Sequence, residues 1–127
     1  MKFLLDTHTV LWFFDAPEKL PETTFRSIRA PTHKKYVSMA SVWELAIKIG
    51  IGKFVFDGGT ERFINNIREN GFGLLSIKVK HVTQVETLPL LHRDPFDRLL
   101  VATAKAESMT ILTADENIRL YDVNCLW

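Results

Sequence analysis

The sequence predicts a single α/β domain, with a mainly parallel sheet of about five short strands flanked by helices. The strand-like runs are short and apolar at successive positions, which is typical of strands buried on both faces of a parallel sheet. Segments with apolar residues at helical spacing separate these runs. The 127 residues contain no linker, internal repeat or low-complexity stretch, so one domain over residues 1–127 is expected.

In the first half of the chain, caps and helix-ending residues mark the element boundaries. Thr7 and Ser41 can each cap a helix, and a helix that Ser41 starts can end at Gly50. Pro17 follows the end of the helix that Thr7 caps, and Pro31 ends a further helical segment. We therefore expect a strand at 3–5, a helix at about 9–14, a helix between Pro21 and Pro31, a strand at 36–38 and a helix from Ser41 to Gly50.

In the second half, the clearest element is a helix from Phe96 to about Ser108. Asp94 is a good cap for it, and Pro95 suits the first helical position. The remaining segments have weaker signals. They predict a helix through Phe63 and Ile67, a strand at 74–77, a helix at 80–88, a strand at 110–112, a helix at 116–120 and a strand at 123–126.

Composition limits the classes of protein to consider. The formal net charge is +1, which neither supports nor excludes nucleic-acid binding, so any such surface must be a local one. The single cysteine, Cys125, excludes an internal disulfide and suits a cytoplasmic protein. Asp6 interrupts the first apolar run after three residues, and no apolar run is long enough to span a membrane.

Four acidic residues stand where apolar runs meet helix starts: Asp6, Glu44, Asp97 and Asp115. In a parallel sheet, residues that follow strands meet at one edge, so these carboxylates are expected close together. There they would repel one another unless a cation lay between them. Each also has a plain structural reading, because an acid near a helix start can act as a cap, and Ser41–Glu44 and Thr113–Glu116 both fit capping boxes.

If a cation is bound, its ligands would be carboxylate oxygens. Such hard ligands favour Mg²⁺ or Mn²⁺. The four histidines are isolated in the sequence, and no His or Cys pair has the spacing of a zinc site. The acids could hold one ion, or two ions about 3.5–4 Å apart.

Four segments together resemble the PIN-domain family of metal-dependent ribonucleases, and in particular its VapC-like toxins. The segments read FLLDTHTVLWF, SVWELAIK, DPFDRLLVATA and TILTADENI, in the order that the family has them. The resemblance implies a parallel sheet flanked by helices and hydrolysis of RNA phosphodiester bonds. It also implies two kinds of protein contact, with a small antitoxin and with a second copy in a homodimer.

The same resemblance implies roles for individual residues. The family's catalytic acids fall on Asp6, Glu44, Asp97 and Asp115. Asp6, Asp97 and Asp115 are the expected metal ligands, while Glu44 either binds the metal or orients the attacking water. Thr113 matches a supporting Ser/Thr of the family. Asp94 is expected as a cap, and the basic residues closest to the motifs that could hold the RNA backbone are Lys48, Arg93 and Arg98.

Two other classes remain as alternatives. A catalytically silent module could keep the same fold for binding a partner, with apolar residues such as Trp12, Phe13, Phe14, Trp43 and Ile49 as a docking surface or dimer contact. A receiver-type signalling domain has a similar length and an acidic Mg²⁺ site. Its pattern has paired acids after the first strand, whereas Asp6 stands alone there.

Overall fold

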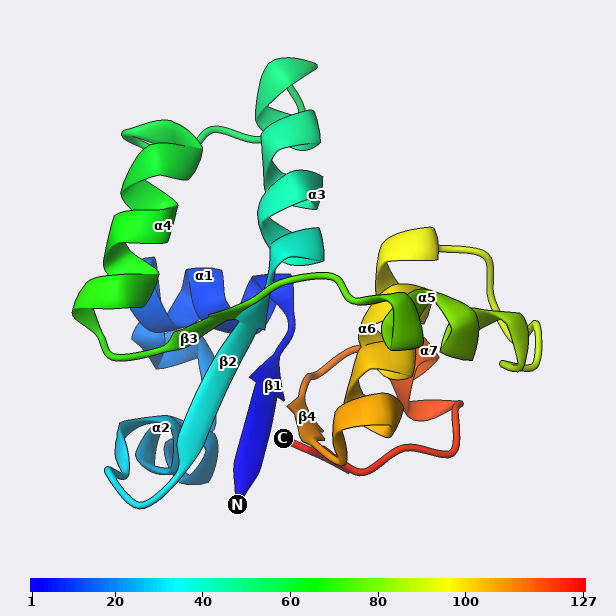
Figure 1. Ribbon diagram of the computed structural model, residues 1–127. Coiled ribbons are helices and arrows are strands. Elements are labelled where there is room, and N and C mark those ends of the chain that lie inside the picture. Colours follow the sequence, from blue (N-terminus) through cyan, green and yellow to red (C-terminus); the bar gives the residue numbers. More distant parts are fainter.

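A five-stranded parallel sheet forms the centre of the molecule, and the computed structural model describes all residues, 1–127. The strand order is β3-β2-β1-β4-β5, so β1 lies in the middle (Figure 1). Every neighbouring pair runs parallel, which confirms the predicted fold class. The strands are β1 (Lys2–Leu5), β2 (Lys34–Ser38), β3 (Gly73–Leu75), β4 (Thr110–Leu112) and β5 (Cys125–Leu126).

Seven α-helices and one short 3₁₀ helix connect and flank the strands. They are α1 (Thr7–Asp15), η1 (Pro17–Lys19), α2 (Glu22–Arg29), α3 (Met39–Gly50), α4 (Gly59–Glu69), α5 (Val79–Glu86), α6 (Pro95–Glu107) and α7 (Glu116–Arg119). None of these helices combines the length and the hydropathy that crossing a bilayer requires.

Alternate side chains of β1 enter two apolar clusters, one on each face of the sheet. Phe3 and Leu5 are buried among side chains of α1 to α4. Leu4 is buried among side chains of α6 and α7. Because successive residues of a strand point to opposite faces, a strand covered on both sides has no polar position. This explains why the run from Phe3 to Leu5 is apolar throughout.

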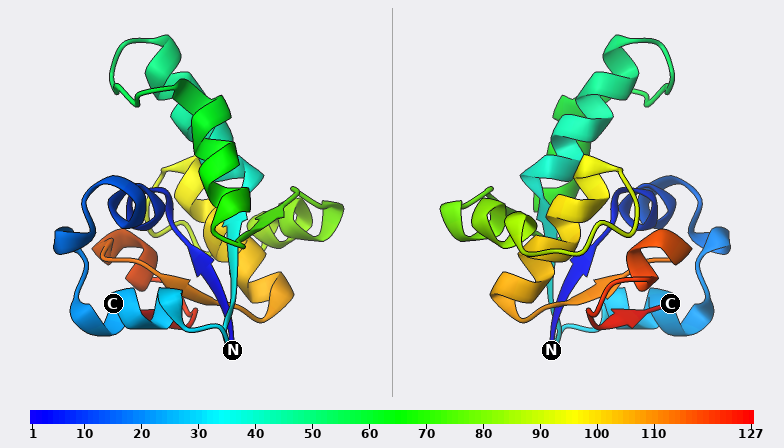
Figure 2. Two further views of the ribbon diagram at one scale, coloured as in Figure 1. Left: turned by 90° about the vertical axis from the view of Figure 1, so that its left-hand side faces the viewer. Right: turned by 90° about the vertical axis from the view of Figure 1, so that its right-hand side faces the viewer.

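Helices α3 and α4 rise together beyond the edge of the sheet at which the strands end (Figures 1 and 2). Helix α3 starts directly at the end of β2, so its first turns stay beside the sheet edge. On the other side of that edge lies the start of α6, and α3 and α6 contact each other. The edge is therefore walled by helices from separate parts of the sequence.

Helices α1 and α3 begin earlier than the sequence predicted, because other residues cap them. Asp6, not Thr7, caps α1. Ser38, not Ser41, caps α3, and its hydroxyl accepts a hydrogen bond from the N–H of Ala40. The capping box predicted for Ser41–Glu44 is therefore wrong, and Glu44 lies in the second turn of α3.

The other boundaries follow the sequence more closely. Asp94 caps α6 and Pro95 is its first residue, as predicted. Asp115 caps α7, so the capping box predicted to start at Thr113 is wrong. Strand β3 ends two residues before the predicted 74–77 strand does, and β5 begins two residues after the predicted start at 123.

Candidate functional site

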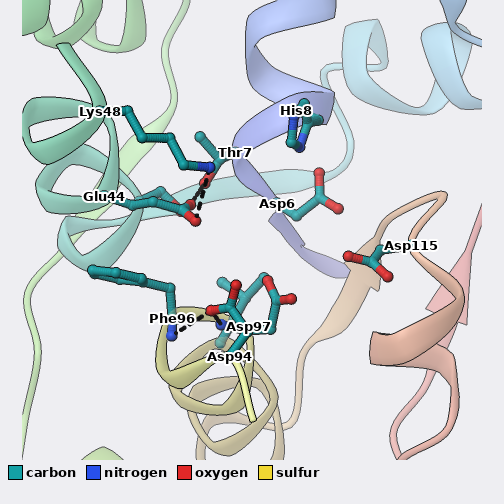
Figure 3. A pocket seen from close by; sticks show the side chains of 11 residues that line it. Asp6, Thr7, His8, Glu44, Lys48, Asp94, Phe96, Asp97 and Asp115 are labelled. Carbon is teal, nitrogen blue, oxygen red and sulfur yellow. Dashed lines mark hydrogen bonds and ion pairs between the residues drawn. The ribbon is translucent and has the colours of Figure 1, made fainter. Parts of the chain in front are cut away.

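Carboxylates from four separate parts of the chain line one cavity at the edge of the sheet (Figure 3). Asp6 follows β1, Glu44 lies on α3, Asp97 lies on α6 and Asp115 follows β4. The cavity has a volume of about 90 Å³, which is room for about three waters but not for a nucleotide. Its other lining residues are Thr7, His8, Ser41, Lys48, Asp94, Phe96 and Leu100.

Asp6 is the most buried of the four acids, and both of its carboxylate oxygens accept hydrogen bonds. Its side chain is at the junction of β1 and α1, and the residue is only 7% exposed. Oδ1 accepts from the backbone N–H of Thr9 at 2.8 Å and from the Thr9 hydroxyl at 2.7 Å. Oδ2 accepts from the hydroxyl of Thr113. These contacts hold the carboxylate in one orientation.

Thr113 connects Asp6 to the turn that carries Asp115. The residue is fully buried directly after β4. Its hydroxyl donates to Asp6 and accepts a hydrogen bond from the backbone N–H of Asp115 at 3.0 Å. A hydroxyl can do both at once because it carries one donor and two acceptor sites. Thr113 therefore fixes two of the four acids relative to each other.

Glu44 is turned toward two side chains of the same cavity. Its Oε1 accepts a hydrogen bond from the hydroxyl of Thr7 at 2.9 Å. Its Oε2 lies 3.4 Å from Nζ of Lys48, one helical turn further along α3. Lys48 is the one Lys or Arg side chain that lines the cavity, so it offsets only part of the negative charge there.

The carboxyl group of Asp97 is less acidic than that of an aspartate in water. Burial raises the pKa of Asp97 to about 6, and the negative charges of Asp94, Asp115 and Glu44 contribute to this rise, whereas a hydrogen bond from His92 opposes it. Because charges act on each other over short distances, the effect of Asp115 and Glu44 on the pKa reflects their closeness to Asp97. The repulsion expected from the sequence is thus present within the cavity.

A chain of polar groups behind Asp97 was not predicted from the sequence. Arg98 and the backbone N–H of His92 both donate to the hydroxyl oxygen of Tyr121. The hydroxyl proton is then free to bond to Nδ1 of His92, which lies 3.0 Å away. Nε2 of His92 therefore carries its own proton and donates to Asp97 at 3.3 Å. The one sequence signal for the contact of His92 with Asp97 is that the two residues are five positions apart.

The three basic residues considered for the RNA backbone have different surroundings. Lys48 lines the cavity. Arg98 points away from it and donates to the carbonyl of Pro89 and to Tyr121. Arg93 is exposed to solvent and does not line the cavity.

The cavity has the composition of a divalent-cation site, although its side chains are not gathered on one point. All donors are hard oxygens, which Mg²⁺ and Mn²⁺ prefer. No three His, Cys, Asp or Glu side chains are close enough together to hold one ion in this conformation. Instead, Asp6, Glu44 and Asp97 each bond to protein partners. The residues fit a cation chemically, and binding one requires their side chains to rotate toward it.

Comparisons with known proteins agree with this architecture. The family model of the PIN domain matches residues 3–124. A search of the curated proteins found no matching sequence. Among solved structures, the chain is similar to one in VapBC2 from Rickettsia felis bound to a DNA fragment from their promoter, with a TM-score of 0.78 and 15% identity, covering 100% of this chain and 99% of that one.

Two further structures show the same fold. A chain of VapBC-1 from nontypeable Haemophilus influenzae has a TM-score of 0.69 at 16% identity, and the match covers 99% of this chain and 97% of that one. A chain of FitAcB from Neisseria gonorrhoeae has a TM-score of 0.61 at 18% identity, and the match covers 98% and 96%.

Proposed function

This chain belongs to the PIN-domain family, and on that premise we propose that it is a Mg²⁺- or Mn²⁺-dependent endoribonuclease. It hydrolyses RNA phosphodiester bonds in the cytoplasm as the VapC-like toxin of a toxin–antitoxin pair. The observation that carries the proposal is the single cavity lined by Asp6, Glu44, Asp97 and Asp115. Four acids from distant parts of the chain would not be gathered in one cavity for capping alone, because their mutual repulsion opposes folding.

The acids divide into two roles in this proposal. Asp6, Asp97 and Asp115 hold the metal, directly or through water, and Glu44 binds it or orients the attacking water. The metal, when bound, stabilises charge on the scissile phosphate and makes a bound water more acidic. Thr113 keeps Asp6 in place. Lys48 lies beside Glu44 and can bond to a phosphate oxygen within the same cavity.

The decisive experiment replaces Asp6 by Asn and maps cleavage of total RNA with Mg²⁺ and with EDTA. Asn can still accept the hydrogen bonds from Thr9 through its carbonyl oxygen, and the Thr113 hydroxyl can turn to accept from its amide, so the fold is expected to persist. Cleavage should fall by at least about 100-fold, because a ligand charge is lost. Retained cleavage by Asp6→Asn, or metal-independent cleavage by the unmodified protein, would contradict the proposal.

A matched control is Asp57→Asn, which makes the same chemical change at an exposed position outside the cavity. It should cleave RNA as the unmodified protein does. If the unmodified protein binds a partner but cleaves no RNA with either metal, the chain is instead a catalytically silent binding module.

We further propose an antitoxin partner and a homodimer, since α3 carries apolar side chains that this chain does not cover. Trp43 is 57% exposed, Ile47 on the same helix is 39% exposed, and Ile51, directly after the helix, is 61% exposed. The other candidates for a docking surface, Trp12, Phe13, Phe14 and Ile49, are partly buried against the core. Light scattering of Ile47→Glu, alone and with the antitoxin, tests whether α3 forms the protein contact. An oligomeric state that is unchanged in both samples would contradict this assignment of α3.

A further inference from the structure

A second cavity adjoins the acidic one and has a different character. It is lined by Asp6, His8, Thr9, Trp12, Ala114 and Asp115, and its volume is about 260 Å³. Three of these residues, Asp6, His8 and Asp115, also line the acidic cavity, so the two spaces meet at the acids. Figure 3 shows Asp6 lying between His8 and Asp115 at this junction. The second cavity is close to the roughly 300 Å³ at which pockets begin to hold drug-sized ligands.

Aromatic rings form one side of this second cavity. His8 and Trp12 are one helical turn apart on α1, and their ring centroids lie 5.9 Å apart. Trp127 packs against Trp12 from the end of the chain, with ring centroids 5.8 Å apart. The indole of Trp12 is thus held in position by neighbours on α1 and beyond β5, while part of its surface remains accessible.

Most polar groups beside the rings already make hydrogen bonds within the protein. The Thr9 hydroxyl donates to Asp6 or to the carbonyl of Leu112, at 2.7 and 2.9 Å. Oδ1 of Asp115 accepts from the N–H of Asn117 at 2.8 Å. What the cavity offers a ligand is therefore mainly an aromatic face. Such a face binds nucleic-acid bases by stacking, with little dependence on which base it is.

The charges around the second cavity also favour a neutral base as its occupant over a phosphate. Asp6 and Asp115 would repel a phosphate placed in the second cavity, but a base is neutral. Nζ of Lys19 lies 5.8 Å from the centroid of the Trp12 ring, and this exposed lysine makes no ion pair. Lys19 is placed to attract the next phosphate of a strand whose base stacks on Trp12.

We propose that this second cavity is a base-binding subsite, in which Trp12 stacks on a nucleobase next to the scissile phosphate of single-stranded RNA. Lys19 contacts the neighbouring phosphate. This inference rests on the proposed ribonuclease function, because the acidic cavity must hold the scissile phosphate. It adds which side chain holds a base of the substrate, and that base must be unpaired, since a base within a duplex cannot stack on a protein side chain.

The test begins with the cleavage site that the unmodified protein chooses in a single-stranded RNA. That RNA is then made again with an abasic ribose on either side of the cut bond. Both RNAs are offered to the unmodified protein, to Trp12→Leu and to Trp12→Phe. Fluorescence anisotropy with Ca²⁺, a cation that binds carboxylate oxygens, measures binding under conditions in which no cleavage is seen, and kcat and KM with Mn²⁺ measure cleavage. Phe25→Leu is the control, because it removes a partly buried aromatic ring on α2 that lines neither cavity.

Trp12→Leu should weaken binding of the intact RNA by about 5- to 100-fold, the range for loss of one stacked base. Trp12→Phe should retain most of the affinity, which separates stacking from a fold defect. The abasic RNA at one of the two positions should lose a similar factor with the unmodified protein. Combining Trp12→Leu with that RNA should cost no more than either change alone, because both remove the same contact.

Lys19→Gln should reduce the slope of log affinity against log salt by about one, whereas Lys53→Gln, an exposed lysine outside the subsite, should not.

If the unmodified protein cleaves RNA while Trp12→Leu binds intact RNA equally well, the subsite is overturned and the ribonuclease function stands. Fully additive losses also overturn it, since the base then lies elsewhere. If the unmodified protein neither binds nor cleaves RNA, both proposals fail.

Discussion

At the scale of single residues, the carboxyl group of Asp97 is much less acidic than that of an aspartate in water. Burial and three neighbouring acids raise its pKa to about 6, although His92 donates a hydrogen bond to it. A buried carboxylate in a cluster of like charges costs free energy whenever it is ionised. The free protein therefore carries a local strain that a cation would relieve.

A first prediction concerns the stability of the protein in EDTA. The pKa of Asp97 is about 6 when the chain is folded, against 3.8 for an aspartate in water, so the folded state binds more protons between these values. The free energy of unfolding should therefore decrease as pH rises from about 4 to about 6. Thermal unfolding scans across this range measure the change, and Asp97→Asn should remove its part of the slope.

The control for this prediction is His92→Phe. It removes the hydrogen bond that lowers the pKa of Asp97, so the pKa should move upward. The carboxyl carbon shift of Asp97 in NMR follows this titration directly. A midpoint that stays the same or moves down in the variant would contradict the geometry of the His92 contact.

At the scale of elements, α5 is attached to α6 by a buried histidine. His81 is 1% exposed, and its Nδ1 accepts the backbone N–H of Lys78 at the start of α5. Its Nε2 therefore carries the proton and donates to Glu107 at 2.9 Å, near the end of α6. Lys78 and Lys80 also approach the same carboxylate, at 3.8 and 2.8 Å. The carboxylate of Glu107 thus interacts with three side chains at the start of α5.

A second prediction follows from this contact. Hydrogen bonds from Lys80 and His81 lower the pKa of Glu107 from 4.5 to about 2. The unfolded chain then binds more protons in this window, so the stability that Glu107 contributes is present above about 4.5 and is lost as pH falls toward 2. Acid unfolding monitored by circular dichroism should begin at higher pH in Glu107→Gln than in the unmodified protein.

Glu86→Gln is a suitable comparison, because Glu86 is an exposed acid at the end of α5 without an ion pair. It should unfold like the unmodified protein. Identical acid unfolding of Glu107→Gln would mean that solvent screens the cluster and that it adds nothing to the attachment of α5.

At the scale of the whole molecule, the acidic cavity predicts a coupling between metal binding and stability. Mn²⁺ that binds only the folded state stabilises it by about 2.7 kcal/mol at 100 times the dissociation constant. For a domain of this size that corresponds to a rise in Tm on the order of 10 °C. Differential scanning fluorimetry with Mn²⁺ and with EDTA measures it, and no shift at saturating metal would count against the site.

Asp115→Asn separates the repulsion among the acids of the cavity from their binding of a metal. In EDTA its Tm should be raised, because the charge of Asp115 contributes to the elevated pKa of Asp97, and Asn is as good a helix cap as Asp. With Mn²⁺ its Tm should rise less than that of the unmodified protein. Asp57→Asn should respond to Mn²⁺ as the unmodified protein does.

Much of this molecule could be predicted from the sequence, because its strongest signals are local. The apolar runs at β1 and β4 and the Asp94–Pro95 start of α6 need no knowledge of the rest of the chain. The grouping of the four acids in one cavity was also expected, since residues that follow parallel strands meet at one edge.

What could not be predicted depends on partners that are distant in the sequence. Asp6 was already a candidate cap for α1, but its hydrogen bond from Thr113, 107 positions away, was not predicted. The contact of His92 with Asp97 depends on Tyr121, which is brought there by packing of α7. Trp12 was expected in the core or in a protein contact, and only the fold places it beside the acids.

The central position of β1 has a consequence for when the acidic cavity forms during synthesis. The first strand emerges early, but Asp6 meets Thr113 and Asp115 only after β4 has been made and has paired with β1. Domains fold as units, and contacts between distant residues form late. A growing chain that ends before β4 therefore holds Asp6 without its later partners. The acidic cavity is therefore complete only when nearly the whole domain has been translated.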